Sequence, residues 1–381
     1  MDQNDRAKTE EKLMRGKPLQ SRGLRGRHAP SGDGLGSSTP PPPEANTRKR
    51  GDVLRAPKRR HHFVLWIILL IVIVFGVWLA MFSSKVDANL HSFPVQEQQE
   101  LDQVLAPSAS WGTQPVNVLL LGSDARADDP GIGARTDTMV LARIDPATKI
   151  VSLVSLPRDV LIESDDYGTY KLNAAYTYEG ADRAVTDVEE LCGIKIDHVV
   201  VTDFVGLADL VDAIGGIDVY LDEGIDNPKA GTATLEAGQQ HINGAQALVM
   251  ARDRDYVDGD YTRQSSQRKV LSGIVKRILT MAPWEMPGAI EGCSKCLATD
   301  SSTNTLGLIL LAVRLKVPWA GMQLRTSVLP SQPADIGGVS YVIADKAGVR
   351  ELMARLENGG NVEDPVVASS IDQDIAQARG W

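Results

Sequence analysis

The feature that most constrains this chain is an uninterrupted apolar segment, residues 63–82, which reads FVLWIILLIVIVFGVWLAMF. It contains no charged residue and no proline. At about 1.5 Å per residue, a helix of this length spans the roughly 30 Å hydrocarbon core of a bilayer. A cleaved signal peptide is the alternative, but the segment is too long for one and begins too far from the N-terminus. We therefore predict one transmembrane helix at 63–82.

The charges that flank this segment predict its orientation. The basic cluster KRRHH occupies residues 58–62, whereas Lys85 is the only base close behind the segment. The positive-inside rule then predicts a single-pass protein of the cell membrane, with a cytoplasmic N-terminus and with residues 83–381 outside the cell.

The first 62 residues differ in composition from the rest of the chain. They hold 15 Lys and Arg against 7 Asp and Glu, and they are rich in Gly, Pro and Ser. Such a segment cannot bury a core, so we predict a disordered basic cytoplasmic tail at 1–62. Its basic residues are explained by the orientation of the membrane segment and by contact with anionic lipid. Binding of a cytoplasmic partner is the alternative.

The remaining residues hold 25 Lys and Arg against 42 Asp and Glu, a balance that argues against a nucleic-acid partner. We predict a juxtamembrane linker at 83–114, a folded domain at 115–283 and an extension without readable motifs at 284–381. Within the domain, apolar runs alternate with helical patterns. Strands are expected there at 116–122, 138–144, 150–157, 198–204 and 217–221, and helices at 181–193, 205–213 and 262–279; in the extension, helices are expected at 303–316 and 345–357. This alternation predicts an α/β domain with a mixed central sheet flanked by helices.

Three cysteines fall in the outer region. Outside the cell, Cys293 and Cys296 of the CSKC motif can form a disulfide, which we favour over a zinc site because no histidine lies nearby. Cys192 follows an amphipathic run and is expected to be a buried, inert thiol.

Polar clusters stand at the ends of the predicted strands. They comprise Asp124 and Arg126, Arg135 and Asp137, Arg158 and Asp159, and, much later, Arg252, Arg254, Asp260 and Arg263. Because ligands of open α/β sheets bind at the carboxyl ends of strands, these clusters can form one site. Aspartates suit Mg²⁺ and arginines suit phosphate, which together indicate a metal-bridged phosphate group. Any one cluster alone is better explained as a weak surface salt bridge.

Several catalytic classes lack their motifs here. The sequence contains no GxxxxGK[ST], no GxSxG and no HExxH, and its six histidines are scattered. A histidine base or a catalytic zinc therefore has little support. Since an outer site has no ready ATP, we expect a phosphate donor delivered by the membrane.

Seven ordered motifs resemble the LytR-CpsA-Psr (LCP) family of membrane-anchored cell-wall ligases. They are LLLGSDAR, GARTDTMVLARIDP, VSLVSLPRDV, KLNAAYTYEG, DFVGLADLVDAIGGIDV, HINGAQALVMAR and GDYTRQ, between about residues 116 and 279. The resemblance implies an α-β-α fold. It also implies a Mg²⁺-dependent phosphotransferase that moves a glycopolymer from a polyprenyl-pyrophosphate carrier to peptidoglycan.

The resemblance also implies roles for individual residues. Asp124 and Asp137 would hold Mg²⁺ at the pyrophosphate, and Asp159 would orient Arg158 or the waters of the metal. The arginines implied as phosphate contacts are Arg126, Arg135, Arg158, Arg252, Arg254 and Arg263, of which Arg135, Arg158, Arg252 and Arg254, with Asp159, form the catalytic set. Leu207, Leu210 and Val211 would line a pocket for the polyprenyl tail, with ordinary core as their alternative.

The sequence departs from the family pattern at one position. The family commonly has RxxRQ after its Gly-Asp, whereas here Ser266 stands in place of the second arginine. Arg268 comes two positions later, about 200° around a helix, and would not simply replace it. Two alternatives to the ligase stay open: hydrolysis of polyprenyl pyrophosphate, and a non-catalytic scaffold that binds lipid-linked glycan.

Overall fold

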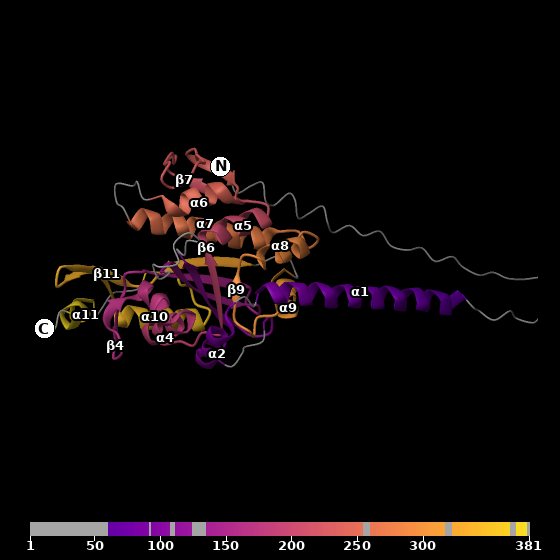
Figure 1. Ribbon diagram of the computed structural model, residues 1–381, viewed down its shortest axis with the longest axis horizontal. Helices are drawn as coiled ribbons and strands as arrows, with labels where there is room; N and C mark the ends of the chain where they lie inside the picture. Colours follow the sequence, from indigo (N-terminus) through magenta and orange to yellow (C-terminus); the bar gives the residue numbers. More distant parts are fainter. Residues whose placement is uncertain are drawn as a thin grey trace, which may run out of the picture. The chain divides into compact units, whose positions relative to one another are not determined.

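The computed structural model (Figure 1) describes residues 60–90, 93–106, 111–123, 135–253, 260–316, 322–365 and 371–378. Side chains are described for these residues except 60–65, 260–264, 316, 371–373 and 376. The chain divides into two units, residues 1–61 and 62–381.

The apolar segment lies in the first helix, α1 (Arg60–Leu90). By length and composition, Trp66–Leu90 is sufficient to cross a membrane, and its apolar side chains from Trp66 to Val77 are exposed. A helix over 63–82 is therefore confirmed, and it continues beyond that segment to Leu90, while its crossing of a membrane stays a prediction. Its orientation stays a prediction.

A six-stranded sheet forms the centre of the second unit, in the order β10-β3-β2-β1-β6-β9. The bounds are β1 (Val116–Ser123), β2 (Thr136–Asp145), β3 (Ile150–Leu156), β6 (His198–Asp203), β9 (Ala298–Thr299) and β10 (Gln323–Val328). Strand β1 is parallel to β6, β3 is parallel to β10, and β2 runs antiparallel between β1 and β3. Four strands therefore run in one direction, and the predicted mixed sheet is confirmed.

Apolar side chains alternate between the two faces of this sheet, as the period of a strand requires. On one face, Leu119 and Leu121 pack with α4 (Ala181–Cys192) and α10 (Lys346–Glu357). On the other face, Val116 and Val118 pack with α9 (Thr305–Lys316) and with α7 (Asp260–Thr280). Helices cover both faces, which gives the α-β-α arrangement (Figure 1).

A second core lies beyond α7 and orients the helices near the site. It joins α5 (Phe204–Ala213), β7 (Ile217–Leu221), β8 (Gly238–Ile242), α6 (Gly244–Arg252) and α8 (Met286–Cys293). Leu210 and Val211 of α5 are buried in this core, as is most of Leu207, so these side chains serve ordinary packing.

The region after residue 283 contributes to the same sheet. Strands β9 and β10 both come from it, and β10 pairs with β3 along its whole length. Shorter elements complete the unit: α2 (Val95–Val104), β4 (Leu161–Ser164), β5 (Gly168–Lys171), η1 (Leu172–Ala174), α3 (Ala175–Glu179), β11 (Ser331–Ile336), β12 (Val339–Ala344) and α11 (Ile371–Ala378). The central sheet thus draws strands from both sides of residue 283.

The cysteines correct one expectation. Cys293 and Cys296 are free thiols, so the predicted disulfide is absent. The reason is local: Cys293 ends α8, and the Cys296 thiol lies 3.2 Å from the carbonyl oxygen of Cys293, where it donates to the helix end. Cys192 is buried as expected, and burial raises the pKa of its thiol to about 12, which keeps it inert.

Candidate functional site

The topology brings Asp137, Arg158 and Arg252, which belong to three of the predicted polar clusters, to one edge of the sheet. Strands β1, β3, β6 and β10 all end there, and β2 begins there. Arg158 follows the end of β3, while Asp137 stands at the start of β2. Helix α6 brings Arg252 to the end of β6, where its guanidinium lies 4.8 Å from the ring centroid of Phe204. Carboxyl ends of strands are the usual ligand-binding edge of such sheets.

Asp137 owes its position to an irregularity in the strand pairing. Gly122 pairs with Thr138, but Ser123 pairs with Thr136, so Asp137 is the extra residue of a β-bulge. A bulge redirects the side chain that it contains and is common beside functional sites. The Asp137 side chain is 7% exposed, and its Oδ1 accepts a hydrogen bond of 2.6 Å from Arg158 Nη1.

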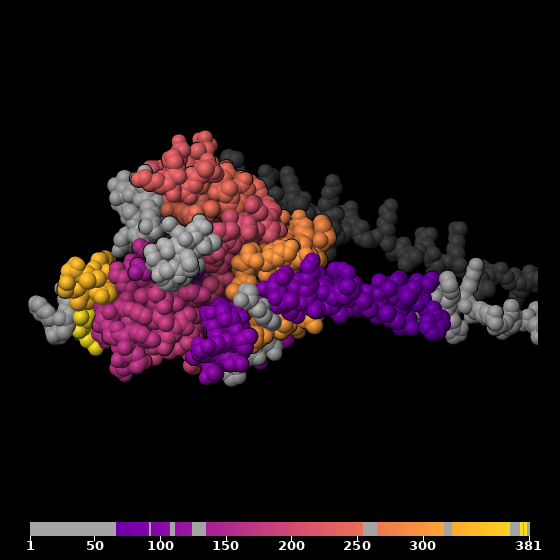
Figure 2. Space-filling view, viewed as in Figure 1, coloured from indigo at the N-terminus to yellow at the C-terminus, as the bar shows by residue number. Residues whose placement is uncertain are grey.

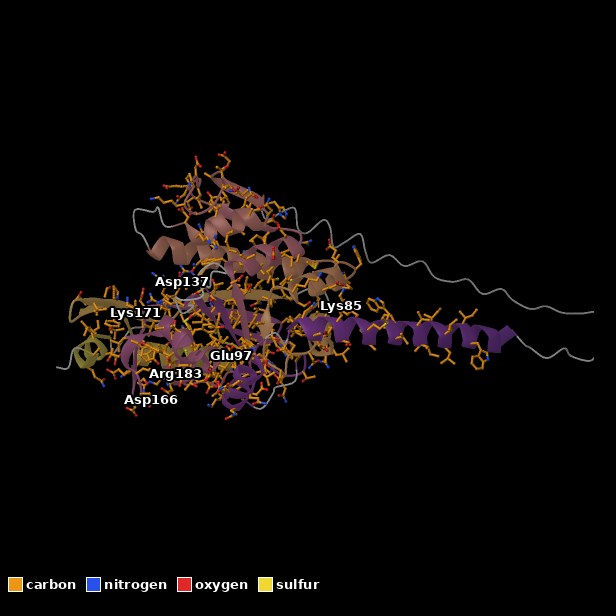
Figure 3. All side chains as sticks on the ribbon, in the orientation of Figure 1. Lys85, Glu97, Asp137, Asp166, Lys171 and Arg183 are labelled. Atoms are coloured by element: carbon orange, nitrogen blue, oxygen red, sulfur yellow. The ribbon has the colours of Figure 1, made fainter. Side chains whose placement is uncertain are left out.

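Charges of alternating sign extend from this pair. Arg158 Nε lies 3.5 Å from Asp159 Oδ2, and Lys171 Nζ lies 2.9 Å from Asp159 Oδ1. Figure 3 labels Asp137 and Lys171, the two ends of this series of charges. Because these side chains are largely withdrawn from water, their interactions are screened less than those of an exposed pair. Arg158 therefore lies between two carboxylates, and an orienting role of Asp159 stays a prediction.

Helix α7 closes this network from the other side. A small cavity of about 20 Å³ is lined by Asp137 and Arg158 together with Gln267 and Arg268. It has room for a single water molecule. Gln267 Nε2 donates to the carbonyl oxygen of Ala251, 3.3 Å away, and so ties α7 to the end of α6.

Arg268 differs from the other arginines of the site. Burial lowers the pKa of its guanidinium, and no hydrogen bond or ion pair joins Arg268 to any residue that the structure describes. Ser266, which stands in place of the family's arginine, is itself buried. Although Arg268 is rotated about the helix relative to that position, its long side chain reaches the Asp137–Arg158 cavity. Sequence reasoning missed this, and it also assigned no role to Gln267.

Other predicted site residues are placed only in part. Arg135 is exposed at the entry to β2. Arg263 lies near the start of α7, and its side chain falls outside the described residues. Asp124, Arg126 and Arg254 also lie outside the described residues.

A divalent cation was tested against the donors present. Within the part of the chain that the structure describes, no group of three or more His, Cys, Asp or Glu side chains is arranged to hold a metal. Asp137 has one oxygen engaged by Arg158, and beside it the buried Thr136 hydroxyl has no hydrogen-bond partner among the described residues. Mg²⁺ keeps several waters and needs only one or two carboxylates. Among the described residues Asp137 is the one carboxylate of the site placed to take part, and Mg²⁺ binding stays a prediction.

A wider hollow opens at the same edge of the sheet. Its volume is about 410 Å³, and its lining includes Ser123 and Asp203, the last residues of β1 and β6. Asp203 caps α5 by accepting a hydrogen bond from Gly206 N–H at 2.6 Å. Asp209 and Lys295 also line the hollow.

These features define a class: an α/β protein with one apolar helix long enough to cross a membrane, and with a basic and acidic site at the carboxyl edge of its sheet. The sequence model of the LytR_cpsA_psr family matches residues 79–358. The chain therefore belongs to the LytR-CpsA-Psr family.

Individual relatives agree with this membership. The chain is 39% identical over 263 residues to the Biofilm regulatory protein A of Streptococcus mutans, an alignment that covers 64% of this chain and 63% of that protein. It thus spans less than two-thirds of that relative. It is 31% identical over 311 residues to the polyisoprenyl-teichoic acid–peptidoglycan teichoic acid transferase TagU of Enterococcus faecalis, covering 76% and 97% of the two chains. The solved structure of TagT bound to LIIa-WTA matches with a TM-score of 0.53 and 25% identity, over 65% of this chain and 91% of that one.

Proposed function

We propose that this protein is a phosphotransferase that moves a glycopolymer from a polyprenyl-pyrophosphate carrier to peptidoglycan. The Enterococcus faecalis relative, which aligns over 97% of its length, is named for a transfer of this kind. The similar TagT structure is described as bound to LIIa-WTA. Both support a lipid-linked donor and a cell-wall acceptor. We further propose that the N-terminus is cytoplasmic and the sheet domain extracellular, because the basic cluster precedes α1.

One observation carries the proposal: Asp137, which lies in a β-bulge, forms a charged site with Arg158 and Arg268 at the carboxyl edge of the sheet. Arg158 is held by two carboxylates, and Arg268 lines the same cavity. Planar guanidinium groups match phosphate oxygens and stay charged, so they suit a pyrophosphate. The network would thereby stabilise negative charge that moves during phosphoryl transfer.

The reaction exchanges one phosphorus–oxygen bond for another. An acceptor hydroxyl oxygen bonds to the phosphorus next to the glycan, and the bond from that phosphorus to the bridging oxygen breaks. Lipid monophosphate leaves with the bridging oxygen, and the hydroxyl proton goes to solvent. Asp137, with Asp124 as the second carboxylate, would hold Mg²⁺, which when bound supplies positive charge at the pyrophosphate. Arg158 and Arg252 would orient the donor.

Mass spectrometry tests the proposal with the full chain in detergent. The substrates are a polyprenyl-pyrophosphate-linked glycan and peptidoglycan, with Mg²⁺ or with EDTA. We expect polyprenyl monophosphate together with glycan-modified peptidoglycan in Mg²⁺, and loss of both products in Arg158→Ala and Asp137→Asn. Lys269→Ala is the matched control, because Lys269 pairs with the exposed Asp222 on the surface of α7.

The alternatives predict other products. Release of lipid monophosphate without modified peptidoglycan would instead favour a hydrolase. Donor binding that survives in all variants, without any product, would favour a scaffold. Thermal melting of each variant separates lost chemistry from lost folding, since Arg158→Ala removes the cation that pairs with the buried Asp137.

A further inference from the structure

The outer end of α1 is fastened to the start of α9. Helix α1 continues past residue 82 to Leu90, and Asp87 lies on this continuation. Asp87 Oδ1 accepts hydrogen bonds from the backbone N–H and the hydroxyl of Thr305, at 2.7 and 2.6 Å. The same hydroxyl lies 3.4 Å from the carbonyl oxygen of Ser83. Thr305 begins α9, so a side chain of α1 caps the N-terminus of α9.

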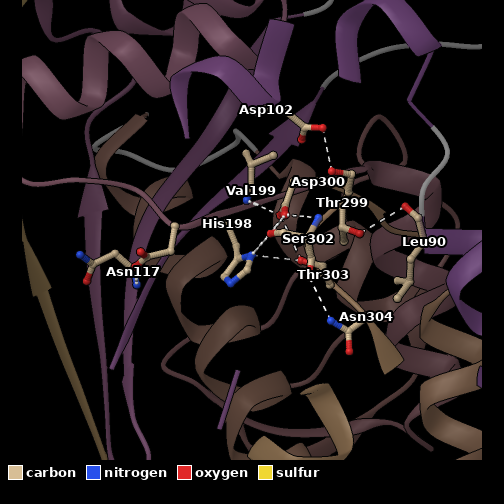
Figure 4. Close-up of polar contacts among 12 residues, drawn as sticks. Leu90, Asp102, Asn117, His198, Val199, Thr299, Asp300, Ser302, Thr303 and Asn304 are labelled. Carbon is tan, nitrogen blue, oxygen red and sulfur yellow. Dashed lines mark hydrogen bonds and ion pairs between the residues drawn. The ribbon is translucent and has the colours of Figure 1, made fainter. Parts of the chain in front are cut away.

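Further contacts make this junction rigid. Lys85 Nζ lies 2.6 Å from Glu291 Oε1 of α8, and Asn89 Nδ2 donates to Ser294 Oγ at 3.1 Å. The Thr299 hydroxyl donates to the carbonyl oxygen of Leu90 at 3.3 Å (Figure 4). Figure 2 shows the orange residues of this region against the indigo helix α1. The membrane-spanning helix therefore carries α8 and α9 at a fixed position along its axis.

The segment behind Thr299 is tied to the sheet in turn. Asp300 accepts from the Val199 backbone N–H at 3.1 Å and lies 3.2 Å from His198 Nδ1 (Figure 4). The side chains of His198 and Asp300 are both fully buried. Because β6 belongs to the central sheet, the position of α1 fixes that of the sheet as well.

Helix α9 is apolar on both of its faces. Leu311 and Leu315 are 7% exposed and pack into the sheet core. On the outer face, Leu306, Leu310 and Val313 are 55%, 38% and 52% exposed. These three residues, the α9 outer stripe, follow the spacing of one helical face. A contiguous exposed stripe of this kind marks an interaction surface.

The position of the stripe identifies what covers it. Asp87 lies five residues after Phe82, which is about 7.5 Å along a helix. The lipid headgroup region extends only roughly 5–8 Å beyond the hydrocarbon core on each side. Helix α9 therefore begins at the depth of the headgroups. Trp284, which is 82% exposed just before α8, adds an aromatic residue of the kind enriched at membrane interfaces.

We propose that the α9 outer stripe and Trp284 lie in the headgroup region of the outer leaflet, so that the domain rests on lipid beside its own anchor. The partner is a lipid surface, and the exposed Arg314 at the end of the stripe suits anionic headgroups. This proposal depends on α1 crossing the membrane, but it is independent of the catalytic chemistry.

Depth-dependent quenching tests it with the full chain in lipid nanodiscs that hold one copy each. A fluorophore is attached to Leu306→Cys, Leu310→Cys or Val313→Cys, with labelled wild type correcting for the three native thiols. The matched controls are Tyr220→Cys and Val339→Cys, exposed apolar positions on β7 and β12. Val72→Cys, in the middle of the apolar segment, reports insertion of α1.

Doxyl-labelled phosphatidylcholine should lower the emission at the three α9 positions about twofold, because a face in the interface lies roughly 5–10 Å deep. The two controls should not respond. Quenching at Val72 with none beyond the controls at α9 would overturn the proposal. A parallel set of nanodiscs holds two copies each. If the three α9 positions are shielded from solvent only in these discs, the stripe contacts a second chain, and the proposal is again overturned. Absent quenching at Val72 would overturn the anchor on which the proposal depends.

Discussion

Arg268 is a charged side chain that the protein has partly removed from water without giving it a carboxylate among the described residues. Burial of an arginine is unfavourable unless a partner compensates it, and burial lowers the pKa of this one. Its place beside Asp137 and Arg158 makes an anionic ligand the natural partner. In the function proposed above, it would supply the positive charge that is missing where Ser266 replaces the family's arginine.

Arg268→Gln should lower kcat/KM for the lipid-linked donor by about ten- to a hundredfold, since a hydrogen bond to a charged group contributes roughly 1.5–3 kcal/mol. Thermal stability should hold, because the variant removes a charge that has no partner among the described residues. Lys269→Gln, at the next position of α7, should leave kcat/KM unchanged. Equal losses in both variants would show that the effect belongs to the helix rather than to Arg268.

Asp300 gives folding a defined dependence on pH. Burial acts to raise the pKa of this carboxyl, but hydrogen bonds from His198, Ser302 and the Val199 backbone outweigh it, and the pKa is lowered overall. A carboxyl with a depressed folded-state pKa contributes stability above its unfolded value of about 4, and this is lost as pH falls through the folded value. The melting temperature should therefore drop below about pH 4.

The Asp300→Asn variant should melt at a lower temperature at neutral pH and show a flatter decline in acid. The matched control is Asp222→Asn, because the pKa of Asp222 is also lowered, by its exposed pair with Lys269. Solvent screens that pair, so its loss should change the melting curve little. Identical acid profiles for wild type and Asp300→Asn would contradict this account.

Among the elements, the crossing of α5 and α6 depends on a glycine. A Cβ added to Gly244, the first residue of α6, would lie 2.1 Å from the carbonyl oxygen of Ala208 in α5. The two helices bring Phe204 and Arg252 together, so their separation matters for the site. Gly244→Ala should destabilise the protein by about 1–3 kcal/mol, measured by denaturant unfolding, because the backbone must move.

Gly288→Ala is the control for this substitution. Gly288 lies in α8, and nothing stands within 4 Å of an added Cβ. Alanine should there be neutral or stabilising by up to about 1 kcal/mol, since it is the better helix former. A neutral Gly244→Ala would mean that α5 and α6 can separate without cost.

The elements also show what sequence alone can predict. The strands at 116–122, 138–144 and 150–157 and the helix ending at Gly193 are confirmed, because long apolar runs and a left-handed glycine cap are strong local signals. Strands β9 to β12 were missed, since β9 is very short and the others carry many polar or exposed residues. The bulge at Asp137 and the stacking of Arg252 on Phe204 depend on pairings between distant segments, which no local pattern contains.

On the scale of the whole molecule, the junction between α1 and α9 couples the anchor to the folded domain. Asp87→Ala removes the cap from Thr305 and should raise amide hydrogen exchange around residues 299–306 by about fivefold, the equivalent of a cap worth roughly 1 kcal/mol. Lys85→Ala, which breaks a mostly exposed pair with Glu291, should raise it far less. Exchange that spreads equally over the central sheet would instead indicate global destabilisation.

The pairing of β10 with β3 has a consequence for biogenesis. The chain is made from its N-terminus, and α1 emerges long before β10, so β3 waits for a neighbour that has yet to be synthesised. If residues 83–381 are exported, the sheet closes only after residue 328 has crossed the membrane. The polypeptide would then travel through the export channel unfolded, with β3 as an unpaired edge that invites aggregation. Secretion of fragments that stop near residue 283 should accordingly fail at the stage of maturation, before any question of activity arises.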